Sequence, residues 1–147
     1  MADYVIIGGG SSGGVIASRL SEDPDVTVCL LEAGGPGTSP LVSTPGAFAA
    51  LIQDYRINTL NWRFNTDPSK ALNDRRLYNP RGKMLGGSSG MNGMVYIRGD
   101  RSDFDHWAEL GNDGWGYNDV LSYFRKAENN ERGEDEFHGS SGPLHVS

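Results

Sequence analysis

The residues with the clearest potential for chemistry form a glycine cluster near the N-terminus. Gly8–Gly13 reads Gly-Gly-Gly-Ser-Ser-Gly and satisfies the spacing G-x-G-x-x-G. An apolar run, Tyr4–Ile7, precedes the cluster, and a stretch with helical periodicity follows it. Glu32 closes the next apolar run, Val26–Leu31. A strand, a glycine turn, a helix and a strand with a carboxylate at its end, in this order, are typical of a dinucleotide site.

Each glycine of this motif has a predicted structural role that depends on its lack of a side chain. Gly8 permits a tight turn from strand to helix, Gly10 lets the backbone approach a pyrophosphate, and Gly13 lets helix and strand pack closely. The pyrophosphate would lie on free N–H groups at the helix N-terminus, including those of the two serines. The Glu32 carboxylate would accept hydrogen bonds from a ribose and repel a 2′-phosphate. The motif by itself leaves FAD and NAD open.

A second glycine-rich stretch lies between Gly82 and Gly93. From Arg81 to Asn92 it reads Arg-Gly-Lys-Met-Leu-Gly-Gly-Ser-Ser-Gly-Met-Asn. It offers several backbone N–H groups and little side-chain bulk, which suits a flat anionic ligand. Continued through Tyr96, Arg98-Gly99 and Asp105, it resembles the first signature of the glucose–methanol–choline (GMC) oxidoreductases. Other stretches also match that family: Leu31–Gly34, Asn61-Trp62, Asp105–Trp107, Gly114-Trp115 and His138-Gly139.

The resemblance implies FAD as the cofactor and, as the reaction, hydride transfer from an alcohol CH–OH group to flavin N5. By similarity, Gly86–Ser88 would pass beside the pyrophosphate and the ribityl chain, and Asn92–Val95 would lie along the isoalloxazine ring. The predicted cofactor contacts are Gly8, Gly10, Ser11, Ser12, Gly13, Glu32, Ala33, Gly86, Gly87, Ser88, Asn92, Gly93, Met94 and Val95.

One position bears on how FAD would be held. Some family members attach FAD covalently through a histidine immediately before the asparagine that matches Asn92. In this chain that position is Met91, which cannot form the bond. The resemblance therefore predicts non-covalent FAD.

No residue of this chain is predicted to be catalytic. In the family, the catalytic histidine and its partner belong to a C-terminal substrate region, which we expect to be absent here. His106 is interpreted as a surface or packing residue. His138 and His145 are expected to have neither a second histidine nor a carboxylate at ligand spacing, so no metal site is predicted.

The elements that position these residues predict an α/β fold, a partial FAD/NAD(P)-binding domain of the Rossmann type with extended loops and additional helices. The chain, 1–147, is interpreted as the N-terminal segment of that domain, with a βαβ unit at 3–33 and a flavin-contacting glycine loop at 80–99. The first two strands read as buried parallel strands. Further predicted elements are a short helix near Pro45–Ile52, strands at Trp62–Asn65 and Leu77–Asn79, helices at Arg101–Leu110 and after an Asn118 N-cap, a loop at Asn129–Glu136 and a strand at Leu144–Val146.

Single side chains and overall composition limit the alternatives. Trp62, Trp107 and Trp115 are predicted core or sheet-face aromatics, with Trp62 the one that could approach the cofactor. The lone Cys29 is interpreted as a buried hydrophobe.

Nineteen acidic and 13 basic residues give a net charge of −6, which disfavours nucleic acid as a partner. No stretch approaches ~18 apolar residues, so no transmembrane segment is expected. The apparent lack of a targeting sequence predicts a cytoplasmic location.

The leading hypothesis is the FAD-binding part of an enzyme that oxidises a small-molecule alcohol to an aldehyde. A second is a catalytically silent FAD-binding fragment, or one piece of a split protein whose C-terminal chain or domain is missing. A non-redox lyase on the same fold is a third. An NAD-linked dehydrogenase is a fourth, but it leaves Arg81–Asn92 without a role.

Overall fold

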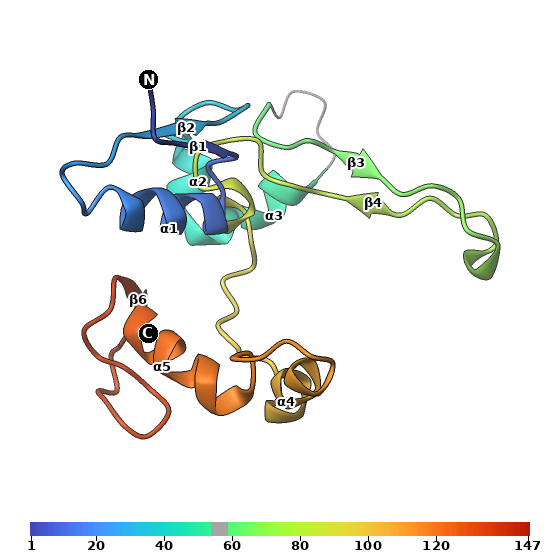
Figure 1. Cartoon of the computed structure of the whole chain (residues 1–147). Coiled ribbons are helices and arrows are strands. Elements are labelled where there is room, and N and C mark those ends of the chain that lie inside the picture. The colour runs from blue at the N-terminus through green and yellow to red at the C-terminus, as the bar shows by residue number, and fades with distance from the viewer. Residues whose placement is uncertain (54–58) are drawn as a thin grey trace. The chain divides into compact units, whose positions relative to one another are not determined.

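The computed structural model describes residues 1–53 and 59–147 (Figure 1). It forms two compact units, Met1–Val95 and Tyr96–Ser147. Both contain helices and strands, so the predicted mixed α/β class is confirmed.

The first unit begins with the predicted βαβ arrangement. Strand β1 (Tyr4–Ile7) pairs in parallel with β2 (Val28–Leu31), and helix α1 (Ser11–Leu20) connects them. β2 begins two residues later than predicted because the Val26 N–H donates to the Asp23 carbonyl at 3.1 Å, which keeps Val26 in the preceding turn. Helix α1 packs on one face of the two-stranded sheet (Figure 1).

The expectation that these strands are buried is wrong. Val5, Ile7 and Leu31 have 60%, 86% and 51% of their surface exposed, and Cys29 is only half-buried. Parallel strands are buried when helices cover both faces of their sheet. Here one helix covers one face of a sheet of two strands, and three of the four β1 side chains, Tyr4, Val5 and Ile7, remain in solvent.

The core of the first unit lies elsewhere, under the second glycine-rich stretch. Leu51, Met84 and Met91 are buried together, and Val42, Ile52 and Leu60 pack around them. The helix predicted near Pro45–Ile52 is present, divided into a 3₁₀ turn η1 (Pro45–Ala47) and helix α3 (Phe48–Ile52), and it follows a short helix, α2 (Pro40–Ser43).

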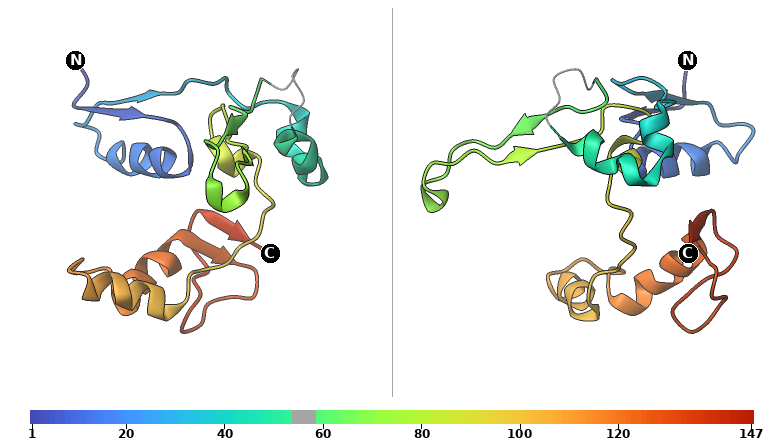
Figure 2. Two further views of the ribbon diagram at one scale, coloured as in Figure 1. Left: turned by 90° about the vertical axis from the view of Figure 1, so that its right-hand side faces the viewer. Right: turned by 180° about the vertical axis from the view of Figure 1, so that it is seen from behind.

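Two short strands extend from this core as an arm (Figure 2). β3 (Phe64–Asn65) pairs antiparallel with β4 (Tyr78–Asn79), and the 3₁₀ turn η2 (Lys70–Leu72) lies between them. At the base of the arm, the buried Asn61 amide donates to the Leu51 carbonyl and the Tyr78 hydroxyl at 3.0 Å each. This amide therefore anchors the arm to the core.

The second unit consists of two helices and a small parallel sheet. Helix α4 (Arg101–Glu109) and helix α5 (Tyr117–Ala127) precede β5 (Glu128–Asn130), which pairs with β6 (Leu144–Val146). Phe104 is the buried aromatic centre between the helices. Its ring contacts Trp107, Tyr117 and Phe124, with ring centroids 5.4, 6.2 and 5.6 Å away.

Two predictions for this unit are wrong. Asn118 is not the N-cap of α5, because the helix begins at Tyr117 after Gly116, and the Asp119 carboxylate accepts from the Gly116 N–H at 3.1 Å. The loop predicted at 129–136 begins with the end of β5, because pairing with β6 extends the backbone there. The strand predicted at Leu144–Val146 is confirmed.

Exposure corrects the interpretation of two tryptophans. Trp107 and Trp115 are 45% and 53% exposed, so they border the aromatic centre and do not lie in a core. No helix in the described ranges is long and apolar enough to cross a membrane.

Candidate functional site

The first glycine cluster forms a turn that joins β1 to α1. Gly8 has φ +98°, a left-handed conformation that favours glycine, and its N–H donates to the Leu31 carbonyl at 2.7 Å. A Cβ on Gly13 would lie 1.9 Å from the Gly8 carbonyl oxygen and 3.3 Å from Ile6 Cγ2. The structure thus shows the tight turn expected at Gly8 and the close packing expected at Gly13.

Helix α1 begins directly at this turn and leaves its first N–H groups free within the helix. Gly10 is the N-cap and supplies no side chain, and the first turn carries no acidic residue. The N–H groups at the first positions, Ser11, Ser12 and Gly13, have no carbonyl four residues earlier inside the helix. They point from the positive end of the helix dipole, which favours an anion.

The Glu32 carboxylate accepts hydrogen bonds from the protein backbone, which the sequence pattern does not predict. Its Oε2 accepts from the Gly9 N–H at 2.7 Å, and its Oε1 accepts from the Gly34 N–H at 2.8 Å. The carboxylate therefore ties the glycine turn to the segment after β2. A carboxylate offers about four acceptor positions, so each oxygen retains capacity for a further donor such as a hydroxyl.

The second glycine cluster lies against the first. The Gly86 N–H donates to the Gly9 carbonyl at 2.8 Å, and a Cβ on Gly87 would lie 2.8 Å from Gly10 Cα. The hydroxyls of Ser11 and Ser89 form a further hydrogen bond. Two stretches almost 80 residues apart in sequence therefore meet through backbone, which glycine permits because it has no side chain.

A cleft of about 760 Å³ opens where the two clusters meet. It is bordered by nine of the fourteen predicted cofactor residues: Gly8, Gly10, Ser11, Ser12, Gly13, Glu32, Ala33, Gly87 and Ser88. Ile7, Leu31 and Gly82 contribute to the wall, as do Trp62 and Arg81. Gly86 does not line the cleft but holds the two clusters together through its N–H.

Arg81 is a lining residue that the sequence interpretation did not assign, and Trp62 was only a candidate. The indole of Trp62 stacks on Phe64, with centroids 5.6 Å apart, and Lys83 Nζ lies 4.6 Å from its ring centroid. The sequence feature that could have indicated a role for Arg81 in the cleft is its position immediately before the glycine-rich stretch. A cation at the start of an anion-binding loop is a sensible candidate contact.

The four predicted flavin-ring residues do not line this cleft. Asn92 and Met94 border a separate, small cavity of about 50 Å³ together with Phe48. The Asn92 side chain accepts from the Met94 N–H at 2.8 Å, and Met94 has φ +57°. All four residues of the Asn92–Val95 segment are exposed.

Met91, immediately before this segment, is buried with only 4% of its surface exposed. It packs with Leu51 and Met84.

The three histidines all lie in the second unit and none borders the cleft between the glycine clusters. His106 is exposed, with Nδ1 3.4 Å from a Glu109 carboxylate oxygen. The expectation that His138 has no carboxylate nearby is wrong, because its Nδ1 lies 2.9 Å from Asp135 Oδ1. The hydrogen bond from His138 lowers the pKa of Asp135 to about 2. Over the described residues, no group of three metal-binding side chains occurs.

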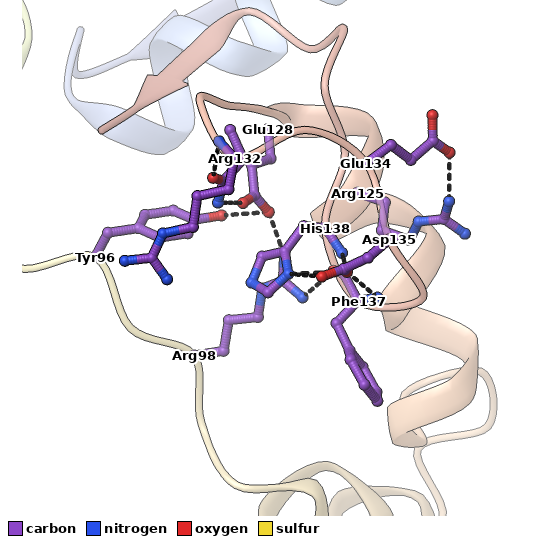
Figure 3. Close-up of polar contacts among 10 residues, drawn as sticks. Tyr96, Arg98, Arg125, Glu128, Arg132, Glu134, Asp135, Phe137 and His138 are labelled. Carbon is purple, nitrogen blue, oxygen red and sulfur yellow. Dashed lines mark hydrogen bonds and ion pairs between the residues drawn. The ribbon is translucent and has the colours of Figure 1, made fainter.

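Among the described residues, the most deeply buried charged group lies in the second unit, and Figure 3 shows it. Glu128 is fully buried and forms an ion pair with Arg98. It also accepts from Tyr96 Oη at 3.2 Å and from the Asn130 amide at 2.6 Å. Burial raises the pKa of Glu128, but the Asn130 hydrogen bond and the Arg98 charge outweigh it, so the pKa is lowered. With every contact inside one unit, we interpret this cluster as structural.

Comparison with known proteins gives a consistent set of relatives. The family model described as GMC oxidoreductase matches residues 2–147. The oxygen-dependent choline dehydrogenase of Sinorhizobium fredii (strain NBRC 101917 / NGR234) is 50% identical over 145 residues, which cover 99% of this chain and 26% of that protein. This chain thus spans about a quarter of the length of the curated relatives it matches.

Solved structures agree with the sequence relatives. Pyridoxine 4-oxidase from Mesorbium loti superposes with a TM-score of 0.91 and 40% identity over 99% of this chain and 28% of its own. A formate oxidase variant from Aspergillus oryzae RIB40, studied for FAD modification, superposes with a TM-score of 0.84 and 32% identity over 98% of this chain and 26% of its own.

Proposed function

The chain belongs to the GMC oxidoreductase family, and we propose that it is the FAD-binding N-terminal part of an enzyme that oxidises an alcohol CH–OH group. The observation that carries the proposal is the direct contact between the two glycine clusters at an open cleft, whose lining includes the first residues of helix α1 and the Glu32 carboxylate. Helix N–H groups suit a pyrophosphate, and a carboxylate suits the hydroxyls of the ribose linked to it.

The residues around the cleft fit the dinucleotide half of FAD. The N–H groups of Ser11, Ser12 and Gly13 would receive the pyrophosphate, with Gly8 and Gly10 shaping the approach. Glu32 would accept from the ribose hydroxyls while remaining bonded to the glycine turn, and Ala33 would border the ribose. On the opposite wall, Gly87 and Ser88 would contact the pyrophosphate or ribityl chain, and Gly86 would keep that wall in place.

We further propose that the segment Asn92–Val95 contacts the isoalloxazine ring. Its exposure and its turn, fixed by the Asn92–Met94 hydrogen bond, support a role for main-chain groups. A backbone N–H beside the flavin would stabilise negative charge that develops on reduction.

We propose that FAD is attached non-covalently, on the ground that Met91 stands where some family members carry the linking histidine. A thioether has no ring nitrogen to bond to the flavin, and this side chain is enclosed in the core. We expect denaturation in acid to release all flavin into the supernatant. Flavin that stays on the precipitated polypeptide would contradict the proposal.

FAD supplies the hydride acceptor. The part of the chain proposed to bind it brings glycine backbone to the pyrophosphate path and orients the ribose through Glu32. Its walls are held by the Glu32 bonds to Gly9 and Gly34 and by the backbone bond between Gly86 and Gly9. We propose that the base that takes the alcohol proton does not belong to the cleft, whose described lining contains no histidine.

The test uses the full-length gene product. It should purify as a yellow protein, and an alcohol added without oxygen should bleach the flavin band. Choline and pyridoxine are the first substrates to try, because related proteins bear the names choline dehydrogenase and pyridoxine 4-oxidase. A protein that holds FAD but is not reduced by any alcohol would favour a silent FAD-binding segment or a non-redox lyase. A colourless protein that does not bind added FAD would refute the proposal.

The observation that favours the silent segment as second candidate is that no histidine lines the cleft among the described residues. The mass of the natural product separates the two: a 15.9 kDa species would favour the silent segment, and a much larger one the enzyme. The cytoplasmic location stays a prediction, which cell fractionation tests.

A further inference from the structure

We propose that Arg81 is an anion-binding residue of the cleft, whose guanidinium group holds the pyrophosphate of FAD. The inference rests on the proposed FAD site. It adds a charged side chain to a site that the glycine motifs describe only through backbone groups.

The path of the chain brings Arg81 to the phosphate-binding turn. Its neighbour Gly82 lies close to Gly87 and Ser88: a Cβ on Gly82 would lie 2.1 Å from the Gly87 carbonyl oxygen, and the Gly82 N–H donates to Ser88 Oγ at 3.2 Å. Gly87 in turn contacts Gly10. Arg81 and the N-terminus of α1 therefore border the same cleft and are connected through direct backbone contacts.

The guanidinium group is fixed along one edge and open along the other. Nη1 donates to Asn79 Oδ1 at 2.5 Å and to the Pro80 carbonyl at 2.7 Å. A guanidinium carries five N–H donors, and within the described residues those on Nε and Nη2 make no hydrogen bond to protein. A planar group that is held through Nη1, while its adjacent Nε and Nη2 have no protein acceptor among the described residues, suits bidentate binding of a phosphate.

The charge of the cleft requires such a group. Its lining includes one carboxylate, Glu32, and one cation, Arg81. The pyrophosphate of FAD adds further negative charge. Lys83 lies close by but is positioned over the Trp62 ring. In the described part of the chain no carboxylate lies within 4.0 Å of the Arg81 guanidinium, so this charge is not neutralised by the protein.

The test is a titration of flavin-free full-length protein with FAD, followed by quenching of flavin fluorescence. Arg81→Met should raise the Kd for FAD about 10- to 100-fold, the effect of losing charge-assisted hydrogen bonds. Arg81→Lys keeps the charge but not the fork and should give a smaller rise, about three- to tenfold. The matched control is Arg76→Met, an exposed arginine of the arm that does not border the cleft, which should stay within about twofold.

Competition by ADP and adenosine separates a phosphate contact from a general effect on the cleft. Arg81→Met should weaken competition by ADP and leave competition by adenosine unchanged. Equal FAD affinity in wild type and Arg81→Met, or equal losses for ADP and adenosine, would overturn the inference. If Arg81→Met does not fold, the same ADP and adenosine comparison on Arg81→Lys decides. A wild-type protein that does not bind FAD would instead refute the proposed function.

Discussion

Replacing Gly13 with alanine tests the geometry on which the cleft depends. The new Cβ would lie 1.9 Å from the carbonyl oxygen of Gly8. Ordinary contact of a methyl group with an oxygen needs over 3 Å, so α1 would have to move away from β1 by more than 1 Å. The Gly8 carbonyl is main chain, so it cannot move aside as the end of a flexible side chain would. We expect Gly13→Ala to lower the free energy of unfolding by about 2–4 kcal/mol, at or above the usual range for overpacking.

The neighbouring glycine provides a matched control with the opposite sign. Gly14 occupies the same helix, and a Cβ there would have no heavy atom within 4 Å. Gly14→Ala should raise the free energy of unfolding by about 0.5–1 kcal/mol, because alanine restricts the unfolded chain and favours helix. Urea denaturation of flavin-free protein, followed by far-UV circular dichroism, measures both. Equal stability of Gly13→Ala and wild type, or equal losses in the two variants, would refute the reasoning.

Three further predictions concern charged groups. Glu32→Gln replaces one acceptor of a backbone N–H by a donor and should cost about 1–2 kcal/mol in urea denaturation; no loss would mean that the carboxylate does not hold the turn. Glu128→Ala leaves Arg98 without its buried partner and should lower stability by about 3–5 kcal/mol, which a Tm unchanged from wild type would contradict. The pKa of Asp135 is lowered to about 2 by His138, so its stabilisation is present above the ordinary pKa of 3.8 and is lost as the pH falls through 2. Asp135→Asn should flatten the fall in Tm over this acid range, and an unchanged acid profile would refute the pairing.

Much of the first unit could be predicted because its signals are local. The turn at Gly8 needs a positive φ, and the contact at Gly13 needs a missing side chain, and both requirements lie within one short segment of sequence. The parallel strands could be read from apolar runs for the same reason. Their burial could not, because it depends on which elements cover the sheet, and Ile7 remains 86% exposed.

Some features of the site could be predicted from local sequence, and others depend on long-range contacts. The types and spacing of Gly8–Gly13 and the position of Glu32 indicated a dinucleotide site without any structure. The structure revealed that the Glu32 carboxylate is already bonded to two backbone N–H groups. It also placed Arg81 and Trp62 on the wall of the cleft, and it left Asn92–Val95 outside the lining.

The sequence by itself determined the backbone freedom of two glycine clusters and the acidic residue after the second strand, since each follows from residue type and short-range spacing. Only the tertiary structure decided that Gly86 bonds to Gly9 and that Gly87 contacts Gly10. The physical reason is that contacts between segments almost 80 residues apart depend on how the intervening chain packs. That packing takes place around Leu51, Met84 and Met91. The spacing of glycines within each cluster does not indicate it.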